Sequence, residues 1–123
     1  MISPKEDIKK FVSEYLVENH EQALERAKNL IQKHPKEIKL LQIIGITFAQ
    51  NNKFDDAIII FKKILKHDLK SFETLINIGI TFYELNKLNE ALEYLEKAKK
   101  LEIRQSDVYY NYGLVYEKKN DIK

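Results

Sequence analysis

The sequence contains no cysteine, only three glycines and only two prolines. The absence of cysteine excludes disulfides, thiolate metal sites and cysteine nucleophiles. So little glycine and proline leaves little room for a turn-rich β architecture and favours a helical protein. The longest uninterrupted apolar run, residues 57–61, is five residues long, far short of the ~18 that a membrane-spanning helix needs. Residues 1–10 lack the apolar core of a signal peptide, and a cytoplasmic protein is therefore predicted.

The charges are nearly balanced. The chain has 21 basic and 19 acidic residues in 123, a formal charge of +2. Only two of the basic residues, Arg26 and Arg104, are arginines, and lysine lacks the planar fork that makes paired contacts with phosphates or bases. Nucleic-acid binding usually depends on a concentrated basic surface. The composition thus predicts a single well-solvated domain and does not favour a nucleic-acid partner.

The three glycines recur at a fixed interval. Gly45, Gly79 and Gly113 are each 34 residues apart, and the pentapeptide around Gly45 (IGITF) is repeated around Gly79. Alignment of residues 38–71 with residues 72–105 gives 11 identities in 34 positions without a gap. A fixed period of this length is typical of stacked structural repeats.

The repeat divides the chain into helical pairs. The repeats span about 4–37, 38–71, 72–105 and a partial 106–123. Apolar spacing predicts helices near 38–51, 54–67, 72–85 and 88–101. In the first repeat Asn19 separates two amphipathic stretches, and Pro35 ends the second of them because proline biases the preceding residue, His34, out of the helical region.

Polar residues at repeated positions mark the helix ends. Asn52, Asn86 and Asn120 share one repeat position, and asparagine tolerates the left-handed conformation that commonly ends a helix. These three residues are therefore predicted to stop their helices. Ser71 and Ser106 are predicted N-caps of the third and fourth leading helices.

The glycines are predicted to allow close helix crossings. Gly45 lies twelve residues before Ala57, and Gly79 lies twelve residues before Ala91. A glycine inside a helix costs about 1 kcal/mol relative to alanine, and close packing of two small residues would offset that cost. A larger side chain at Gly79 should push its helix pair apart.

These residues resemble the tetratricopeptide repeat (TPR) family. The matching positions of the two complete copies are Leu41, Ile44, Gly45, Phe48, Ala57 and Phe61, and then Leu75, Ile78, Gly79, Phe82, Ala91 and Leu95. Tyr109, Tyr112, Gly113 and Tyr116 begin a further copy, whereas the first repeat has Phe11 where the family has glycine. The resemblance implies an all-α, right-handed helical-repeat solenoid of about three and a half helix-turn-helix units, the last one truncated.

The partial last repeat leads to two expectations. Residues 120–123 match only the turn and the start of a second helix. We therefore expect residues 1–123 to form a single TPR-like domain from a longer repeat protein. We also expect self-association through the open C-terminal end, because solenoids usually end in a polar cap.

No catalytic constellation is found, and no enzyme activity, metal site or cofactor is expected. The three histidines, His20, His34 and His67, are interpreted as surface or capping residues. The zinc-protease motif fails at His20, since the fourth residue after it is Leu24. The acidic pair Asp55–Asp56 fits capping of a helix N-terminus better than acid–base catalysis.

The resemblance also implies a binding groove, because in TPR proteins the first helix of each repeat lines a concave surface. The groove residues transferred to this chain are Gln42, Ile43, Ile46 and Gln50, then Ile76, Asn77, Ile80, Tyr83 and Glu84, then Tyr110, Asn111, Leu114 and Lys118. Ile46, Ile80 and Leu114 lie about 200° around their helices from Ile44, Ile78 and Tyr112, so the two sets cannot share one face.

The groove chemistry predicts the class of ligand. Asn77 and Asn111 share a repeat position and could hold a peptide backbone through amide hydrogen bonds. The cations with which some TPR domains clamp an acidic chaperone tail are replaced here by Gln42, Ile46 and Asp107. The groove therefore favours an apolar or mixed peptide or helix of another protein.

The sequence predicts a protein–protein interaction scaffold or adaptor without catalysis. Two alternatives stay open, which are an RNA-binding helical repeat and a regulatory repeat segment of a larger enzyme.

Overall fold

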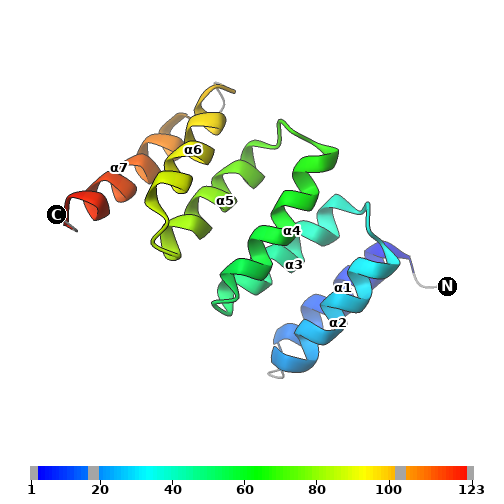
Figure 1. The fold of residues 1–123 in the computed structure, drawn as a ribbon. Coiled ribbons are helices and arrows are strands. Elements are labelled where there is room, and N and C mark those ends of the chain that lie inside the picture. The colour runs from blue at the N-terminus through cyan, green and yellow to red at the C-terminus, as the bar shows by residue number, and fades with distance from the viewer. Residues whose placement is uncertain (1–2, 17–19, 102–104, 122–123) are drawn as a thin grey trace. The chain divides into compact units, whose positions relative to one another are not determined.

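Seven helices form the part of the chain that the computed structural model describes, residues 3–16, 20–101 and 105–121 (Figure 1). They are α1 (Pro4–Leu16), α2 (His20–Lys33), α3 (Ile38–Gln50), α4 (Phe54–His67), α5 (Phe72–Glu84), α6 (Leu88–Lys99) and α7 (Gln105–Asp121). No strand occurs within these ranges. The predicted all-α class is confirmed. The bounds of α4 are those expected from the sequence, and those of α3, α5 and α6 differ by at most two residues.

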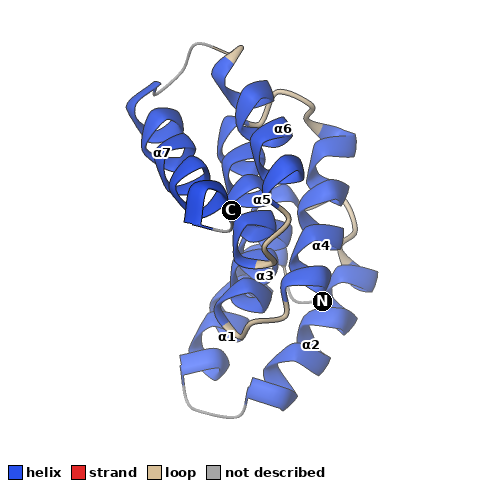
Figure 2. Cartoon of the chain, turned by 60° about the vertical axis from the view of Figure 1, so that its left-hand side comes forward, coloured by secondary structure: helices blue, strands red, loops and turns tan. Residues whose placement is uncertain are grey.

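The chain divides into two compact units, residues 1–60 and residues 61–123, and the division falls within α4. In the first unit, α1, α2 and α3 contact one another. In the second unit, α5 packs against α6 and α7, and α6 also packs against α7 (Figure 2).

Each helix buries one apolar stripe, as amphipathic helices do. In the second unit the fully or nearly fully buried apolar side chains are Phe61 and Ile64 of α4, Phe72, Leu75, Ile76, Ile78 and Phe82 of α5, Leu88, Ala91, Leu95 and Ala98 of α6, and Val108 and Val115 of α7. The corresponding residues of the first unit include Phe11, Ala27, Leu40, Leu41 and Ile44.

The repeated threonines Thr47 and Thr81 are buried without losing hydrogen bonds. The Thr47 hydroxyl donates to the carbonyl of Ile43 at 2.8 Å, and the Thr81 hydroxyl donates to the carbonyl of Asn77 at 2.6 Å. Bonding to the carbonyl four residues back is a usual solution for threonine within a helix. It offsets the cost of burying a polar group and explains how both repeats tolerate threonine here.

The predicted left-handed asparagines are confirmed at two positions. Asn52 and Asn86 have φ values of 61° and 62°. At the first turn the Lys53 amide donates to the Phe48 carbonyl at 2.8 Å. At the second the Lys87 amide donates to the Phe82 carbonyl at 2.9 Å. Together with the Asn52 and Asn86 amide bonds to Ala49 and Tyr83, these bonds form a Schellman motif at the end of α3 and of α5.

Substitution of Asn86 should reveal this conformational requirement. Asn86→Gly is expected to keep or slightly raise stability, whereas Asn86→Ala is expected to lower it by about 1 kcal/mol because alanine disfavours the left-handed region. Chemical denaturation followed by circular dichroism measures the difference. Asn120→Ala, a change within α7, is the matched control and should be neutral or slightly stabilising. Equal costs at the two positions would contradict the assignment.

Two predicted helix ends are wrong. Helix α7 runs through Asn120 to Asp121, so this asparagine does not stop its helix. Asparagine is only weakly unfavourable in a helix interior. At Asn52 and Asn86 the end of the helix also depends on the backbone hydrogen bonds of the Schellman motif. Ser106 lies inside α7, which begins at Gln105, two residues before the start that an N-cap at Ser106 predicts. Ser71 is confirmed as an N-cap, with its hydroxyl accepting from the Thr74 amide at 3.4 Å.

The close crossing at Gly79 is confirmed, with a different principal neighbour. A Cβ atom at Gly79 would lie 3.0 Å from Cγ and Cδ2 of Leu95 and 3.5 Å from the Ala91 carbonyl oxygen. Leu95 therefore fills more of the space above the glycine than Ala91 does. Gly45 is also buried, whereas a Cβ at Gly113 would meet no atom within 4 Å.

The N-terminal repeat follows its predicted pattern where the structure describes it. Helix α2 ends at Lys33, immediately before His34 and Pro35, as expected from the effect of proline on its predecessor. The predicted break at Asn19 lies outside the described residues.

Candidate functional site

Several predicted groove residues gather around one small cavity of the second unit, which we call the α5/α7 pocket. Its volume is about 60 Å³. The buried residues Gly79, Leu95 and Val115 form its inner wall. The more accessible Ile80, Tyr83, Glu84, Asn111 and Leu114 surround its mouth. The first three of these residues come from α5 and the last two from α7, so the leading helices of two successive repeats combine in one site.

The local sequence explains why a cavity forms here. Gly79 has no side chain, and Leu95 of α6 approaches its backbone closely. Val115 of α7 is buried against the same region. These three residues leave a space that none of them fills, and almost all the surrounding groups are apolar.

A lysine holds one side of the pocket. The Lys118 ammonium of α7 donates to the Tyr83 carbonyl at 2.9 Å and lies 4.2 Å from the centre of the Tyr83 ring. A carbonyl oxygen and an aromatic face both attract a cation. The contact connects the end of α5 to α7 and restricts the position of Tyr83 at the pocket mouth.

The other groove residues of the second unit differ in accessibility. The Ile80 side chain is 39% exposed, whereas Ile76 is only 8% exposed and offers little surface to a ligand. Asn77 is half-buried, and Tyr110 is 68% exposed. Ile76 therefore belongs to the core, and Tyr110 is not among the residues that line the pocket.

The first unit carries its share of the predicted groove on α3. Ile46 is 40% exposed, close to the value for its repeat equivalent Ile80. Gln42 and Ile43 are half-buried, and Gln50 is exposed. Ile46 and Ile80 each lie two residues after a buried isoleucine, Ile44 or Ile78. Two residues correspond to about 200° around a helix, so Ile46 and Ile80 are accessible, as expected from helical phase.

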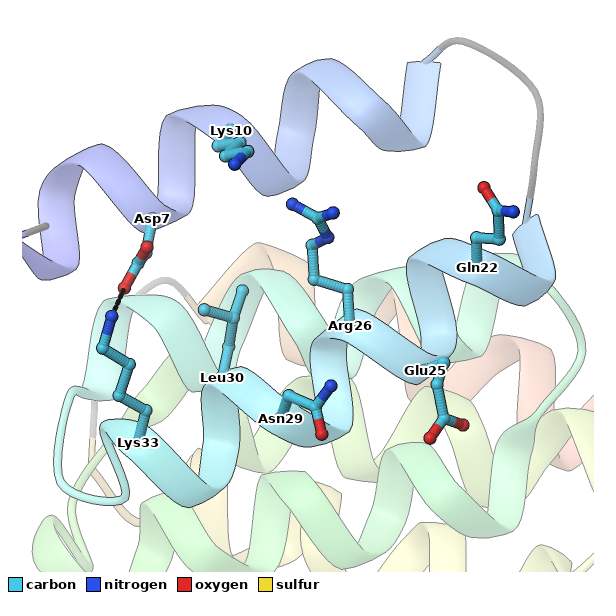
Figure 3. A pocket seen from close by; sticks show the side chains of 8 residues that line it. All are labelled: Asp7, Lys10, Gln22, Glu25, Arg26, Asn29, Leu30 and Lys33. Atoms are coloured by element: carbon cyan, nitrogen blue, oxygen red, sulfur yellow. Dashed lines mark ion pairs between the residues drawn. The ribbon is translucent and has the colours of Figure 1, made fainter.

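A second, polar cavity of about 560 Å³ lies between α1 and α2 (Figure 3). Lys10 of α1 and Arg26 of α2 line it, and Arg26 extends from α2 toward α1. Acidic and amide side chains, Glu25, Gln22 and Asn29, share the same cavity. The mixture of charges gives this cavity no clear preference for a ligand of one sign.

Asp7 anchors one end of this cavity through contacts that the sequence did not predict. Its carboxylate accepts a hydrogen bond from His34 Nε2 at 2.6 Å and lies 3.4 Å from Lys33 Nζ. The hydrogen bond to His34 is the largest cause that lowers the Asp7 pKa, and Lys33 adds to it despite the opposing effect of burial. The His34 side chain is only 13% exposed, so it is not a surface residue, and it lies directly after the last residue of α2. It connects α1 to the end of α2.

The Asp7 contacts predict a loss of stability in acid. Since the folded-state pKa is below the ordinary value of about 3.9, the stabilisation is complete above that value and disappears as the pH falls through the folded-state pKa. Urea denaturation from about pH 6 to about pH 2.5 should show this decline. Asp7→Asn should be less stable at neutral pH and should show a shallower decline. An unchanged slope would contradict the role of Asp7.

A tyrosine–glutamate pair links α6 and α7. The Tyr112 hydroxyl donates a hydrogen bond to Glu96, which lowers the Glu96 pKa. Burial, followed by the Glu96 contact, raises the Tyr112 pKa. Tyr112 also stacks on Tyr116 with ring centres 6.1 Å apart. Both partners are stabilised in their ordinary protonation states at neutral pH, which suits a structural contact.

Among the described side chains, no three histidine, aspartate or glutamate residues lie close enough together to hold a metal ion. In the same ranges, no helix is long and apolar enough to cross a membrane.

Comparison with known proteins adds to these observations. A family model described as tetratricopeptide repeat matches residues 72–102, which contain α5, the asparagine turn and α6. No curated protein matches the sequence. Solved structures of TPR proteins match nearly the whole chain in fold. Residues 72–102 thus match the tetratricopeptide-repeat family, and the described chain has the fold of TPR proteins.

Three of these solved structures illustrate the likeness. MamA AMB-1 has a TM-score of 0.81 at 17% identity, over 96% of this chain and 70% of that one. Another MamA structure has a TM-score of 0.72 at 26% identity, over 82% and 59%. YrrB, described as a TPR protein with an unusual peptide-binding site, has a TM-score of 0.79 at 17% identity, over 92% and 58%. This chain therefore spans between 58% and 70% of their lengths.

Proposed function

We propose that this TPR chain is a non-catalytic interaction scaffold that binds a peptide or helix of another protein through accessible side chains of its leading helices. The observation that carries the proposal is the α5/α7 pocket. It brings Ile80 and Tyr83 of α5 together with Asn111 and Leu114 of α7. Apolar walls with a few polar groups at the mouth are typical of ligand sites.

The fold likeness supports the same proposal. YrrB, whose fold matches, is itself described as having a peptide-binding site. On α3, Gln42, Ile43, Ile46 and Gln50 would offer the first unit's own binding surface. There Ile46 provides the accessible apolar group and the glutamines provide hydrogen bonds.

A capture experiment tests this function. Immobilised wild-type protein is compared with an Ile80→Asp, Asn77→Ala double variant in a lysate of the source organism, after circular dichroism shows equal helicity. Ile59→Asp is the matched control, because Ile59 of α4 is 54% exposed and lies outside the proposed surface. A partner bound by wild type and control and lost from the double variant is the expected result. A partner retained by all three proteins would contradict the proposed surface.

A second candidate is self-association through α7, favoured by its exposed tyrosines. Tyr109, Tyr110 and Tyr116 are each more than half exposed, and Gly113 between them has open space above it. Aromatic residues are enriched at protein interfaces. Sedimentation velocity of wild type and Tyr109→Ser, Tyr116→Ser protein tests this. A concentration-dependent dimer lost in the variant is expected, and a monomer at all concentrations would contradict it.

A further inference from the structure

The size of the α5/α7 pocket limits what it can hold. An engineered cavity of about 150 Å³ binds benzene, whereas this pocket measures about 60 Å³. It is nevertheless several times larger than the ~10–15 Å³ that a single water requires. The volume therefore favours one aliphatic side chain over the larger aromatic ring.

The walls require an apolar occupant. Leu95 and Val115 at the inner wall are fully buried and offer no polar atoms, and Gly79 exposes only backbone in a helix whose amide and carbonyl groups are already bonded. Ile80 and Leu114 continue the apolar surface to the mouth. A polar group pushed into this space would lose its water without gaining a partner, which is unfavourable.

The mouth adds a charge preference. Glu84 presents an exposed carboxylate beside the pocket. The Lys118 ammonium is held by the Tyr83 carbonyl and ring, so its charge is already partly compensated. A cation on the ligand next to the buried group would be attracted by Glu84, and an anion there would be repelled.

We propose that the α5/α7 pocket binds one branched aliphatic side chain, leucine, isoleucine or valine, from a partner peptide that carries lysine or arginine beside it. The proposal rests on the scaffold function proposed above and specifies the chemistry of its ligand. The Lys118–Tyr83 contact restricts the position of Tyr83 at the mouth before binding.

The test begins with a library of random 12-residue peptides displayed on phage and selected on the wild-type protein. Enriched peptides are synthesised, and their affinity is measured by fluorescence anisotropy. We expect an aliphatic residue next to a basic one to be shared by the enriched peptides. Replacing the aliphatic anchor by alanine should weaken binding about tenfold or more, because the buried methyl groups are lost. Replacing the anchor by tryptophan should weaken binding similarly, because the indole ring is larger than the space in the pocket.

Protein variants assign the effects to this pocket. Leu114→Phe narrows the mouth and should abolish the difference between the leucine and alanine peptides. Glu84→Gln should remove the loss caused by replacing the basic residue with alanine. Glu93→Gln is the control for charge, since Glu93 is an exposed residue of α6 outside the pocket, and it should leave binding unchanged.

The possible failures can be told apart. Enriched peptides that bind Leu114→Phe as tightly as wild type would overturn the pocket assignment while leaving the scaffold function intact. Enrichment of acidic or aromatic anchors would overturn the proposed ligand chemistry. If the library yields no binder, both the pocket and the peptide-binding function are contradicted. Because the peptide substitutions need no change in the protein, the result does not depend on the folding of a variant.

Discussion

Leu95→Ala is expected to destabilise the second unit by about 3 kcal/mol, within the range found for leucine truncation in tightly packed cores. Leu95 is fully buried. It fills the space above Gly79, where its Cγ and Cδ2 lie 3.0 Å from the position of a Cβ on that glycine. Removing it enlarges the α5/α7 pocket and leaves a cavity that the surrounding helices cannot fully close. Urea denaturation followed by far-ultraviolet circular dichroism gives the loss.

A double-mutant cycle identifies Gly79 as the partner of Leu95. Gly79→Ala in the wild-type protein gains up to about 1 kcal/mol of helix propensity but forces its methyl group against Leu95. In the Leu95→Ala background the methyl group has room, so Gly79→Ala should be more favourable there by about 1 kcal/mol. Gly113→Ala is the control, because no atom lies within 4 Å of its Cβ position. It should stabilise by about 0.5–1 kcal/mol in either background. Additive effects at Gly79 would contradict the close crossing.

Phe11→Ala is expected to cost about 3–5 kcal/mol, the usual range for a buried phenylalanine. Phe11 is fully buried in α1 and occupies the repeat position of Gly45, Gly79 and Gly113. In the first repeat, the Phe11 ring therefore fills space that does not exist where two helices cross closely at a glycine. Phe11→Gly, although it restores the residue of the other repeats, should cost more than Phe11→Ala because it adds the helix penalty of glycine.

Thermal denaturation of the two Phe11 variants measures these losses. Ser13→Ala is the control on the same helix, since Ser13 is exposed, and its effect should stay within about 0.5 kcal/mol. A Phe11→Gly protein more stable than wild type would show that the first repeat packs like the others. The conclusion that the Phe11 ring fills space between the helices of this repeat would then be wrong.

Much of the fold could be predicted because its determinants are local and repeated. The 34-residue period and the apolar spacing located α3 to α6 to within two residues. The two left-handed asparagines followed from a conformational preference that requires no knowledge of distant contacts. Ile46 and Ile80 could be separated from the buried Ile44 and Ile78 by helical phase alone.

Contacts between distant residues could not be predicted in this way. Asp7 and His34 are 27 residues apart and bond because α1 lies against the end of α2, and neither residue belongs to the repeat pattern. Asn120 has the same identity as Asn52 and Asn86 but remains helical, since a turn needs more than one suitable residue. The α5/α7 pocket likewise depends on how Leu95 and Val115 pack around Gly79. The period of the sequence predicts which face of a helix these residues occupy, but it does not predict the size of the space between them.

The contacts between helices also have a consequence for the order in which the chain can fold. Within each unit, the described helices in contact are neighbours or next neighbours in sequence. Forming such contacts closes only short loops, which costs little entropy and is associated with fast folding. Domains generally fold as units during synthesis, N-terminal first. The contacts among α1, α2 and α3 therefore need no residue of α5, α6 or α7. The first unit is expected to gain structure on the ribosome while the helices that form the α5/α7 pocket are still being synthesised.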